Sequence, residues 1–463
     1  MSHAVARPVV PSSALTNTCR LYSEHVNPRW VDLLGVLEMQ ARYTQCRGVE
    51  LQTDDGRTVL DFLSGYCVYN MGHNHPEILS ALETEMHRLG PTMLQSDIPA
   101  LAAELAEQLI ALAGGRLRKV FFSSSGSEGI ETAIKFTRAH TGRDGLLFCD
   151  GAFHGLTTGA LSIMGNDWWR QGFGSLLPNT QAVPFGDLAA LERELATKRY
   201  AAFFIEPVQA EAGILVPSAD YLPAVQALCR QYQTLLVLDE VQTGLWRTGP
   251  FLASQRWGIE PDMVVIAKAL SGGFIPVGAV LMSEPIYKTV YGTLSRAFIH
   301  ASTFSENALA MRAGLATLQV MQAQRLGQRA ELMGEMLRSR LQEKIGSYEM
   351  VKEIRGVGLL CGIAFQAPQS LKLRLGWETF ARIHSGAFGQ LIVSSLYRRE
   401  NLLTQMCGNR HSVLKVAPPL VVTEAQIDRF VEGVGGIVEE MHAGAGIWRH
   451  GLSLAQRALR HSI

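Results

Sequence analysis

Apolar runs and amphipathic segments alternate through the middle of the chain, from about residue 75 to residue 315. The runs are apolar at almost every position, which is typical of strands buried on both faces of a sheet. Strands that alternate with helices predict an α/β fold with a mainly parallel sheet covered by helices. The predicted strands are Lys119–Ser123, Gly145–Cys149, Ala201–Ile205, Thr234–Leu238, Met263–Ala267 and Val277–Met282, and the clearest helices are Ala100–Ala113, Gly129–His140 and Leu222–Tyr232.

The two ends of the chain differ from this middle part. Residues 1–20 are predicted to form a loose arm, and residues 316–345 a long amphipathic helix. The segment EIRGVGLLCGIAF then begins a smaller α+β unit that runs to the C-terminus. We therefore expect an arm with a segment of the small domain in residues 1–75, a large domain in residues 76–315, and a C-terminal small domain in residues 316–463.

Composition and charge argue against several classes of function. The chain has 463 residues, of which 47% are hydrophobic and 18% charged, so it can bury a large core. Its 42 Lys and Arg residues balance 42 Asp and Glu residues, which gives no support for a surface that binds nucleic acid. The seven cysteines include no C-x-x-C pair, so we expect neither a metal site nor disulfides, and a cytoplasmic location.

The sequence also predicts no segment that crosses a membrane, because no run of about 18 apolar residues occurs. The N-terminal residues MSHAVARPVVPSS lack the apolar core of a secretory signal. The C-terminal stretch AGIWRHGLSLAQRALRHSI is basic and amphipathic. We expect it to pack on its own domain, and contact with a membrane surface is the alternative.

Charged residues stand directly after three of the predicted strands. Lys268 follows the run in DMVVIAKALSGG, Asp239 the run in TLLVLDEVQTG, and Glu206 the run in AAFFIEPVQAEAG. A surface turn would explain each of them singly, since charged side chains are rarely buried without a partner. In parallel sheets, however, active groups gather outside the carboxyl ends of the strands. Three charged residues at such ends therefore indicate a common site.

The segment FFSSSGSEGIETAIKFTRAH starts as a strand and continues as a helix. Ser125 and Glu128 have the spacing of a capping box. The alternative to a plain cap is an anion site, because the hydroxyls and free N–H groups around Gly126 and Ser127 suit a negative charge. The chain contains neither G-x-G-x-x-G after its first strand nor G-x-x-x-x-G-K-[ST], which argues against dinucleotides and nucleoside triphosphates.

Pyridoxal phosphate (PLP) explains this set of residues. Its aldehyde forms a Schiff base with a lysine, and a carboxylate beside its ring nitrogen keeps that nitrogen protonated. Its phosphate suits the helix N-terminus. In DGAFHGLTTGAL, Phe153 or His154 offers an aromatic ring that can stack on the cofactor. The residues therefore predict a PLP-dependent enzyme.

The chain also resembles the class III aminotransferases, the ornithine and acetylornithine aminotransferase group of fold type I. The resemblance spans residues 45–435 and rests on motifs in the family order: DFLSGYCVYNMGHNHP, SSGSE, FHG, EPVQAEAG, LDEVQTGLWRTG, IAKALSGG, STFSENALA and KVAPPLVVTE. It implies a fold type I architecture with a large cofactor-binding domain and a smaller C-terminal domain.

This resemblance implies a role for each matching residue. Lys268 binds PLP covalently and moves a proton, Asp239 pairs with the ring nitrogen, and Glu206 supports the ring region. Thr303 reaches the phosphate of the neighbouring subunit, so a homodimer with shared active sites is expected. The other implied cofactor contacts are Gln242 at the ring 3-oxygen, Phe153 and Val241 on the two ring faces, and Ser125, Gly126 and Ser127 around the phosphate.

Four positions bear on the substrate. Many relatives have an arginine after FHG that binds an α-carboxylate, and here Leu156 stands there. Lys415 replaces a second arginine, keeping the charge without the bidentate fork. Glu211 matches the carboxylate that pairs with that cation when an ω-amine is bound, and Tyr66 matches a tyrosine that contacts substrate. Drift in a loop, compensated by a nearby arginine, would also explain the two replacements.

We therefore expect an aminotransferase that moves an amino group between glutamate or 2-oxoglutarate and an aldehyde or keto compound lacking an ornithine-like α-carboxylate. A lipid or natural-product intermediate, such as a hopanoid, fits that description. A racemase, epimerase or aminomutase on the same fold is the alternative enzyme. A cofactor-binding regulator of transcription is disfavoured, because Lys268 is present and the N-terminal arm is too short for a helix-turn-helix.

Overall fold

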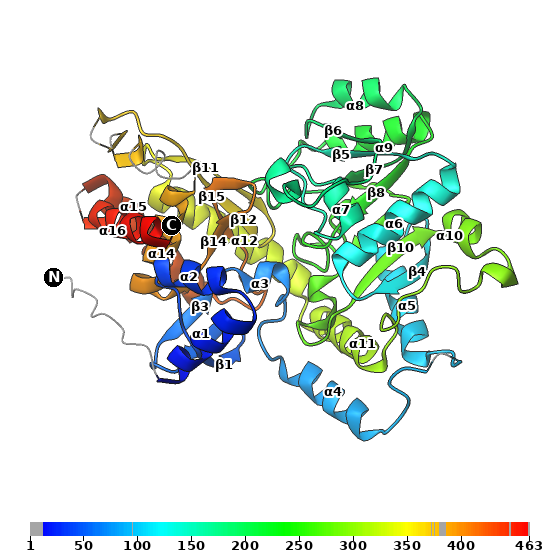
Figure 1. The fold of residues 1–463 in the computed structure, drawn as a ribbon, viewed down its shortest axis with the longest axis horizontal. Coiled ribbons are helices and arrows are strands. Elements are labelled where there is room, and N and C mark those ends of the chain that lie inside the picture. Colours follow the sequence, from blue (N-terminus) through cyan, green and yellow to red (C-terminus); the bar gives the residue numbers. More distant parts are fainter. Residues whose placement is uncertain are drawn as a thin grey trace.

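The computed structural model describes residues 13–94, 96–371, 373–374, 376–378, 386–443 and 446–461. They form two lobes that meet along a broad contact (Figure 1). The larger lobe, on the right, contains a seven-stranded sheet, and the smaller lobe, on the left, combines the first strands of the chain with its C-terminal part. This arrangement places residues from both lobes around the meeting line.

The sheet of the larger lobe has the strand order β4-β10-β9-β8-β7-β5-β6. Strand β10 runs antiparallel to both of its neighbours, and the pairs from β9 to β6 are parallel. The expectation of an α/β fold with a mainly parallel sheet is thus confirmed. The strands are β4 (Leu117–Ser123), β5 (Gly145–Cys149), β6 (Thr180–Val183), β7 (Tyr200–Ile205), β8 (Leu235–Asp239), β9 (Met263–Ile266) and β10 (Gly278–Ser283).

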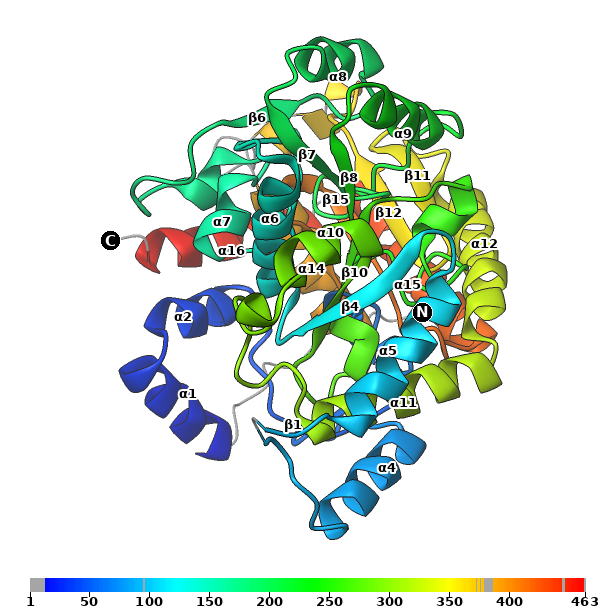
Figure 2. The ribbon, with the colours of Figure 1, turned by 90° about the vertical axis from the view of Figure 1, so that its right-hand side faces the viewer.

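Continuous apolar runs form these strands because both faces of the sheet are covered. In β5, Leu147 and Cys149 face one core, whereas Leu146 and Phe148 face the other. Each fully buried aliphatic side chain contributes about 1.5–3 kcal/mol. Helices α6 (Gly126–Thr141), α7 (Thr158–Ser162) and α10 (Glu284–Tyr291) supply side chains to one core, and α5 (Ala100–Ala113), α8 (Leu188–Leu195), α9 (Tyr221–Gln231) and α11 (Ala308–Ala323) to the other (Figure 2).

The smaller lobe joins the two ends of the chain. Strand β3 pairs in parallel with β13, so that Leu60 lies opposite Leu402. The lobe has two four-stranded sheets, ordered β1-β2-β3-β13 and β11-β12-β15-β14. Its strands are β1 (Tyr43–Arg47), β2 (Glu50–Thr53), β3 (Thr58–Asp61), β11 (Val351–Val357), β12 (Leu360–Phe365), β13 (Leu402–Leu403), β14 (Gln405–Cys407) and β15 (Arg410–Val416), and its helices are α1 (Ser13–His25), α2 (Pro28–Val36), α12 (Leu326–Ile345), α14 (Ala387–Glu400), α15 (Glu424–Ala443) and α16 (Gly446–His461). Two further helices, α3 (Ser64–Cys67) and α4 (Pro76–His87), lead into the larger lobe.

Three expectations from the sequence need correction. The arm over residues 1–20 is helical from Ser13 onward, and residues 1–12 lie outside the described part. The single helix over residues 316–345 is wrong, because Arg325 adopts a left-handed conformation (φ 49°) that separates α11 from α12. The proposed domain boundary after residue 315 falls inside α11, so we now propose it at this break.

Helix α16 includes most of the basic amphipathic stretch. It packs against α2, α14 and α15, and Ile447 and Leu454 are buried in the core of the smaller lobe. Ile447 and Leu454 therefore face the protein itself, which agrees with the expectation that this stretch packs on its own domain. In the described part of the chain, no helix has both the length and the apolar character needed to cross a membrane.

Candidate active site

A cavity of about 440 Å³ lies outside the carboxyl ends of the central strands. Its size is in the range of sites that bind small molecules. Side chains that the sequence singled out come from five separate segments to line it: Ser125, Gly126, Ser127, Phe153, His154, Glu206, Asp239, Val241, Gln242 and Lys268. The fold therefore brings these residues together as the strand-end argument predicted.

Lys268 follows strand β9 and begins the short helix η3 (Lys268–Ser271). Its backbone has a φ of 46°, in the left-handed region that is uncommon for residues other than glycine. Burial lowers the pKa of its ammonium group, because the charged form loses solvation. A larger fraction of the amine is therefore neutral and able to attack a carbonyl carbon.

Asp239 ends strand β8 and is 5% exposed. Its Oδ2 lies 2.8 Å from Nδ1 of His154, and its Oδ1 accepts a hydrogen bond of 3.0 Å from the backbone N–H of Val241. Burial opposes a charge on His154, but the hydrogen bond and the negative charge of Asp239 raise its pKa. The carboxylate is thus fixed in orientation by two partners. The neighbouring Glu240 accepts backbone hydrogen bonds from Ala253 and Ser254, at the start of a 3-10 helix.

Glu206 follows strand β7 and is almost completely buried. Burial raises the pKa of its carboxyl group to about 7, although His154 counteracts this shift. Its Oε1 accepts a hydrogen bond of 2.9 Å from the backbone N–H of Phe153. Glu206 therefore holds the loop that carries Phe153 and His154.

The N-terminus of α6 faces the cavity with two hydroxyls. Ser125 is its N-cap and accepts a 3.2 Å hydrogen bond from the Glu128 N–H, which confirms the N-cap of the predicted capping box. The Glu128 carboxylate accepts from the N–H of Ser124 at 2.6 Å and not from that of Ser125, so the box itself is incomplete. The loop Phe153–Gly155 packs closely against this terminus. A Cβ at Gly155 would lie 2.1 Å from Oγ of Ser127, and Gly155 has a φ of 119°. Only glycine fits there. The segment is thus held where free N–H groups can bind an anion.

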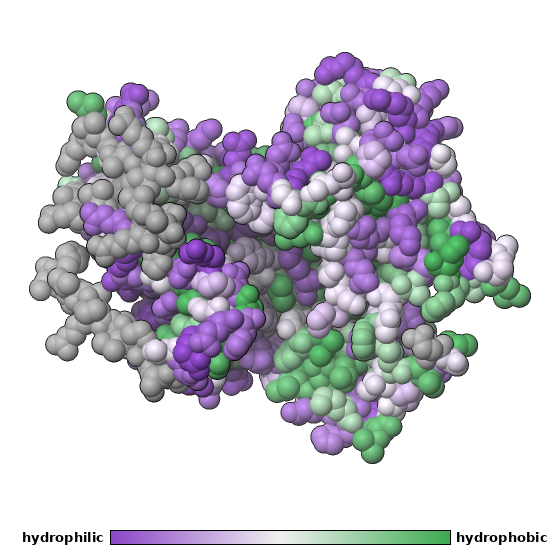
Figure 3. Space-filling view, in the orientation of Figure 1, coloured by the Kyte–Doolittle hydropathy of each residue, from purple (hydrophilic) through white to green (hydrophobic). Residues whose placement is uncertain are grey.

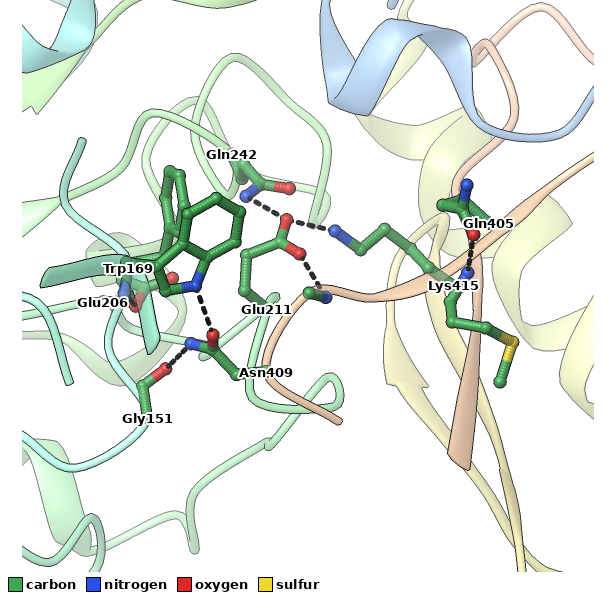
Figure 4. Close-up of polar contacts among 11 residues, drawn as sticks. Gly151, Trp169, Glu206, Glu211, Gln242, Gln405, Asn409 and Lys415 are labelled. Atoms are coloured by element: carbon green, nitrogen blue, oxygen red, sulfur yellow. Dashed lines mark hydrogen bonds and ion pairs between the residues drawn. The ribbon is translucent and has the colours of Figure 1, made fainter. Parts of the chain in front are cut away.

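A second cluster joins the two lobes beside the cavity (Figure 4). Lys415, in β15, donates to Oε1 of Glu211 and lies 5.1 Å from the centre of the Tyr66 ring. Gln242 donates to the same oxygen at 3.1 Å, and the N–H of Gly408 donates to Oε2 at 2.8 Å. Burial favours the neutral carboxyl, but Lys415 overcomes it and lowers the pKa of Glu211 to about 2. Glu211 in turn raises the pKa of Lys415 despite its burial.

The residues around the cavity fit PLP. Next to the lysine amine and the Asp239 carboxylate, Nε2 of His154 and Oε1 of Gln242 are buried polar atoms that have no partner within the described protein. A ring bearing polar substituents can satisfy such atoms. The helix terminus of α6 suits its phosphate. In the described part of the chain, no three His, Cys, Asp or Glu side chains form a group that could hold a metal ion.

Comparison with known protein families agrees with this geometry. Residues 35–438 match the model of the family described as aminotransferase class III. The chain is a class III aminotransferase. PLP is the cofactor of this family, so the chemistry of the cavity and the family agree.

Three relatives illustrate the similarity of this aminotransferase to characterised proteins. The aminotransferase PigE of Serratia sp. is 35% identical over 94% of the chain, and the chain spans 54% of PigE's own length. The putrescine aminotransferase of Pectobacterium atrosepticum is 34% identical, over 91% of this chain and 88% of its own. A structure of the ornithine aminotransferase of Toxoplasma gondii, with PLP at partial occupancy in its active site, has a TM-score of 0.79 and 26% identity, and covers 94% of this chain and 100% of its own.

Two residues that the sequence placed at the site of this aminotransferase lie elsewhere in the chain. Thr303 lines a separate hollow of about 770 Å³ and does not line the cofactor cavity of its own chain. Leu156 donates its backbone N–H to Oγ of Ser127 at 3.3 Å, but the residue is 55% exposed and does not line the cavity. Leu156 therefore stays a proposed substrate contact, on a loop beside the helix terminus that carries Ser127.

Two other residues of the aminotransferase were missed by sequence reasoning. The indole of Trp169 packs edge-on against Phe153, with ring centres 5.3 Å apart, and donates a 2.8 Å hydrogen bond to Asn409. The available signals were the pair of tryptophans in GNDWWRQ and the short turn CGNR before the VLKVAPPL strand. Neither signal indicates that the two segments meet.

Proposed function

We propose that this aminotransferase exchanges amino groups between glutamate or 2-oxoglutarate and a primary amine or aldehyde without an α-carboxylate. The observation that carries the proposal is the buried ion pair of Glu211 and Lys415. Both carboxylate oxygens of Glu211 are hydrogen-bonded and Lys415 is 0% exposed, so the paired cation offers nothing to a substrate carboxylate. A substrate that lacks this carboxylate leaves the pair intact.

A dicarboxylate requires the pair to open. Lys415 then provides a cation for the second carboxylate of glutamate, and desolvation of that carboxylate is compensated. Leu156 supports the same preference for substrates without an α-carboxylate. Its side chain cannot form the bidentate pair that an arginine makes with such a group. One of the relatives is a putrescine aminotransferase, and putrescine is a diamine without any carboxylate. Lipid or natural-product intermediates, hopanoids among them, belong to the same carboxylate-free class.

We propose a separate role for each of the cavity residues. PLP bound there supplies a reactive aldehyde and an electron-withdrawing ring. Lys268 holds the cofactor covalently and, once released, carries a proton at its Nζ. Asp239, fixed by His154, holds a proton at the ring nitrogen. The remaining proposed contacts are Ser125, Gly126 and Ser127 with the phosphate, Phe153 and Val241 with the ring faces, Gln242 with the ring oxygen, Glu206 with the ring region through the loop it holds, and Tyr66 with substrate beside Lys415.

We also propose a homodimer in which Thr303 contributes to the phosphate site of the partner subunit. The hollow that contains Thr303 supports this arrangement, because exposed apolar side chains line it: Phe298 (75%), Leu94 (59%) and Met93 (38%). Figure 3 shows apolar surface gathered over the lower part of the larger lobe, around α4 and α11. Exposed apolar patches of this kind mark interaction surfaces, and twofold dimers are the commonest assembly.

Two half-reactions test the proposed function. The purified holoenzyme is mixed with glutamate alone, and release of 2-oxoglutarate with conversion of the cofactor to its amine form is measured. A racemase would instead invert the donor and keep the cofactor unchanged, which would contradict the proposal. Hexylamine and ornithine are then compared as donors, and we expect hexylamine to react faster at equal concentration.

A further inference from the structure

The turn between β14 and β15 reaches from the smaller lobe into the larger one (Figure 4). Asn409, in this turn, donates from Nδ2 to the carbonyl of Gly151 at 2.8 Å. Its Oδ1 accepts from Nε1 of Trp169 at 2.8 Å and from Nδ2 of Asn166 at 3.1 Å. Its backbone N–H donates to the carbonyl of Glu211 at 2.9 Å. One asparagine therefore connects three separate segments of the larger lobe.

Trp169 lies next to both parts of the site. Its ring contacts Phe153, which lines the cofactor cavity. A Cβ at Gly408 would lie 3.4 Å from Cζ2 of Trp169 and 3.0 Å from Oε2 of Glu211. Trp169 does not itself line the cofactor cavity, but its indole contacts Phe153, which does, and comes close to the turn that holds Glu211. Because Asn409 already accepts its N–H, the ring presents only hydrocarbon to a substrate.

The same turn also holds the ion pair. The N–H of Gly408 donates to Oε2 of Glu211, and the adjacent Asn409 holds Trp169. The same short turn therefore holds both the Glu211 carboxylate and the indole of Trp169.

We propose that Trp169 is a specificity-determining residue that receives the hydrocarbon portion of the amine substrate, and that Asn409 is the positioning residue that holds it there. The substrate class is a primary amine or aldehyde with an apolar chain of several carbons. This inference rests on the proposed function, because it assumes that the carboxylate-free substrate reacts while Glu211 and Lys415 stay paired. The inference adds to the proposed function, because it names Trp169 as the side chain that favours an apolar substrate chain over a charged one.

The test uses holoenzyme variants and single-turnover half-reactions with hexylamine and with glutamate, followed by the visible absorbance of the cofactor. Trp169→Ala and Asn409→Ala should raise the half-saturating concentration of hexylamine about tenfold, which corresponds to two lost methylene contacts. The limiting rate and the glutamate half-reaction should change less than about twofold. Trp169→Phe, which keeps an apolar ring, should retain most of the hexylamine affinity.

The matched control is Phe173→Ala. Phe173 follows Trp169 in the same loop, is 71% exposed, and does not line the cavity. Its replacement should leave the ratio of the half-saturating concentrations of hexylamine and glutamate unchanged. Equal effects of Phe173→Ala and Trp169→Ala on this ratio, or an unchanged ratio in Trp169→Ala, would overturn the inference. If the wild type instead prefers ornithine to hexylamine, the proposed function itself fails, so the two failures are distinguishable.

Discussion

Lys415 and Glu211 form an ion pair between the two lobes in which the lysine is completely buried and the glutamate is 8% exposed. Such a pair depends on both members, since removal of one leaves an uncompensated charge in the interior. We expect Glu211→Gln to lower the free energy of unfolding by about 3–5 kcal/mol. Urea denaturation at neutral pH measures this change. The double variant Glu211→Gln with Lys415→Met removes both charges and should recover part of the loss; a double variant no more stable than Glu211→Gln would contradict the argument.

The same pair predicts a pH dependence of stability. The pKa of Glu211 lies at about 2 in the folded protein, below its ordinary value of 4.5. A depressed carboxyl pKa stabilises the folded state at pH values above 4.5, and this contribution is lost as the pH falls from 4.5 toward 2. Urea midpoints of the wild type should therefore fall more steeply over this range than those of Glu211→Gln. Parallel pH profiles for the two proteins would show that Glu211 does not titrate in this way.

We predict that PLP is attached to Lys268. Reduction of the holoenzyme with borohydride, followed by peptide mass spectrometry, should find the cofactor on this residue. Lys268→Ala should lose the covalent attachment and about a thousandfold or more of the activity. Lys288→Ala, at an exposed lysine of α10, serves as the control and should behave as the wild type. Cofactor on any other lysine would refute the assignment.

Substrate preference gives a fourth measurable prediction. A buried carboxylate without its charge-assisted partner loses roughly 2–5 kcal/mol, which corresponds to about a 30- to 5000-fold reduction in kcat/KM for ornithine relative to a carboxylate-free amine. Leu156→Arg adds the guanidinium fork that many relatives carry at this position and should improve ornithine use, whereas Leu156→Gln should not. If ornithine is the best donor of the wild type, the role assigned to Leu156 is wrong and another cation binds the ornithine carboxylate.

The dimer is tested at its apolar surface. Leu294 is 97% exposed near the Thr303 hollow, and Leu332, in α12, is 63% exposed in the other lobe. A charge buried in an interface is strongly unfavourable, so Leu294→Glu should weaken self-association about tenfold or more. Leu332→Glu should have no such effect. Light scattering over a dilution series measures both, and a fully active wild-type monomer would exclude shared active sites.

Sequence patterns predicted those parts of the fold that depend on local burial. The sequence predicted strands β5 and β7 because helices cover both faces of the sheet there, so that every position of these strands is buried and apolar residues follow one another. Strand β6 was missed, since it lies at the sheet edge and only Val183 of its residues is buried. The break between α11 and α12 was missed because the residues around Arg325 are good helix formers and no proline marks the end.

In the candidate site, too, local sequence patterns predicted some residues and missed others. Lys268, Asp239 and Glu206 were found because a charge directly after an apolar strand stands out in a linear sequence. The contact of Trp169 with Asn409 joins residues 240 positions apart, and no local pattern predicts which loop meets which turn. Leu156 was placed in the pocket by analogy of position, although its side chain is more than half exposed in the folded chain.

The parallel pairing of β3 with β13 has a consequence for how the protein is made. At a synthesis rate of about 5–20 residues per second, Leu60 leaves the ribosome roughly 20–70 s before its partner Leu402 is translated. During that interval the larger lobe can fold, but the edge of β3 has nothing to pair with. The nascent chain therefore carries an open strand edge for most of its synthesis, so that a lower growth temperature or a larger chaperone supply should raise the yield of this enzyme.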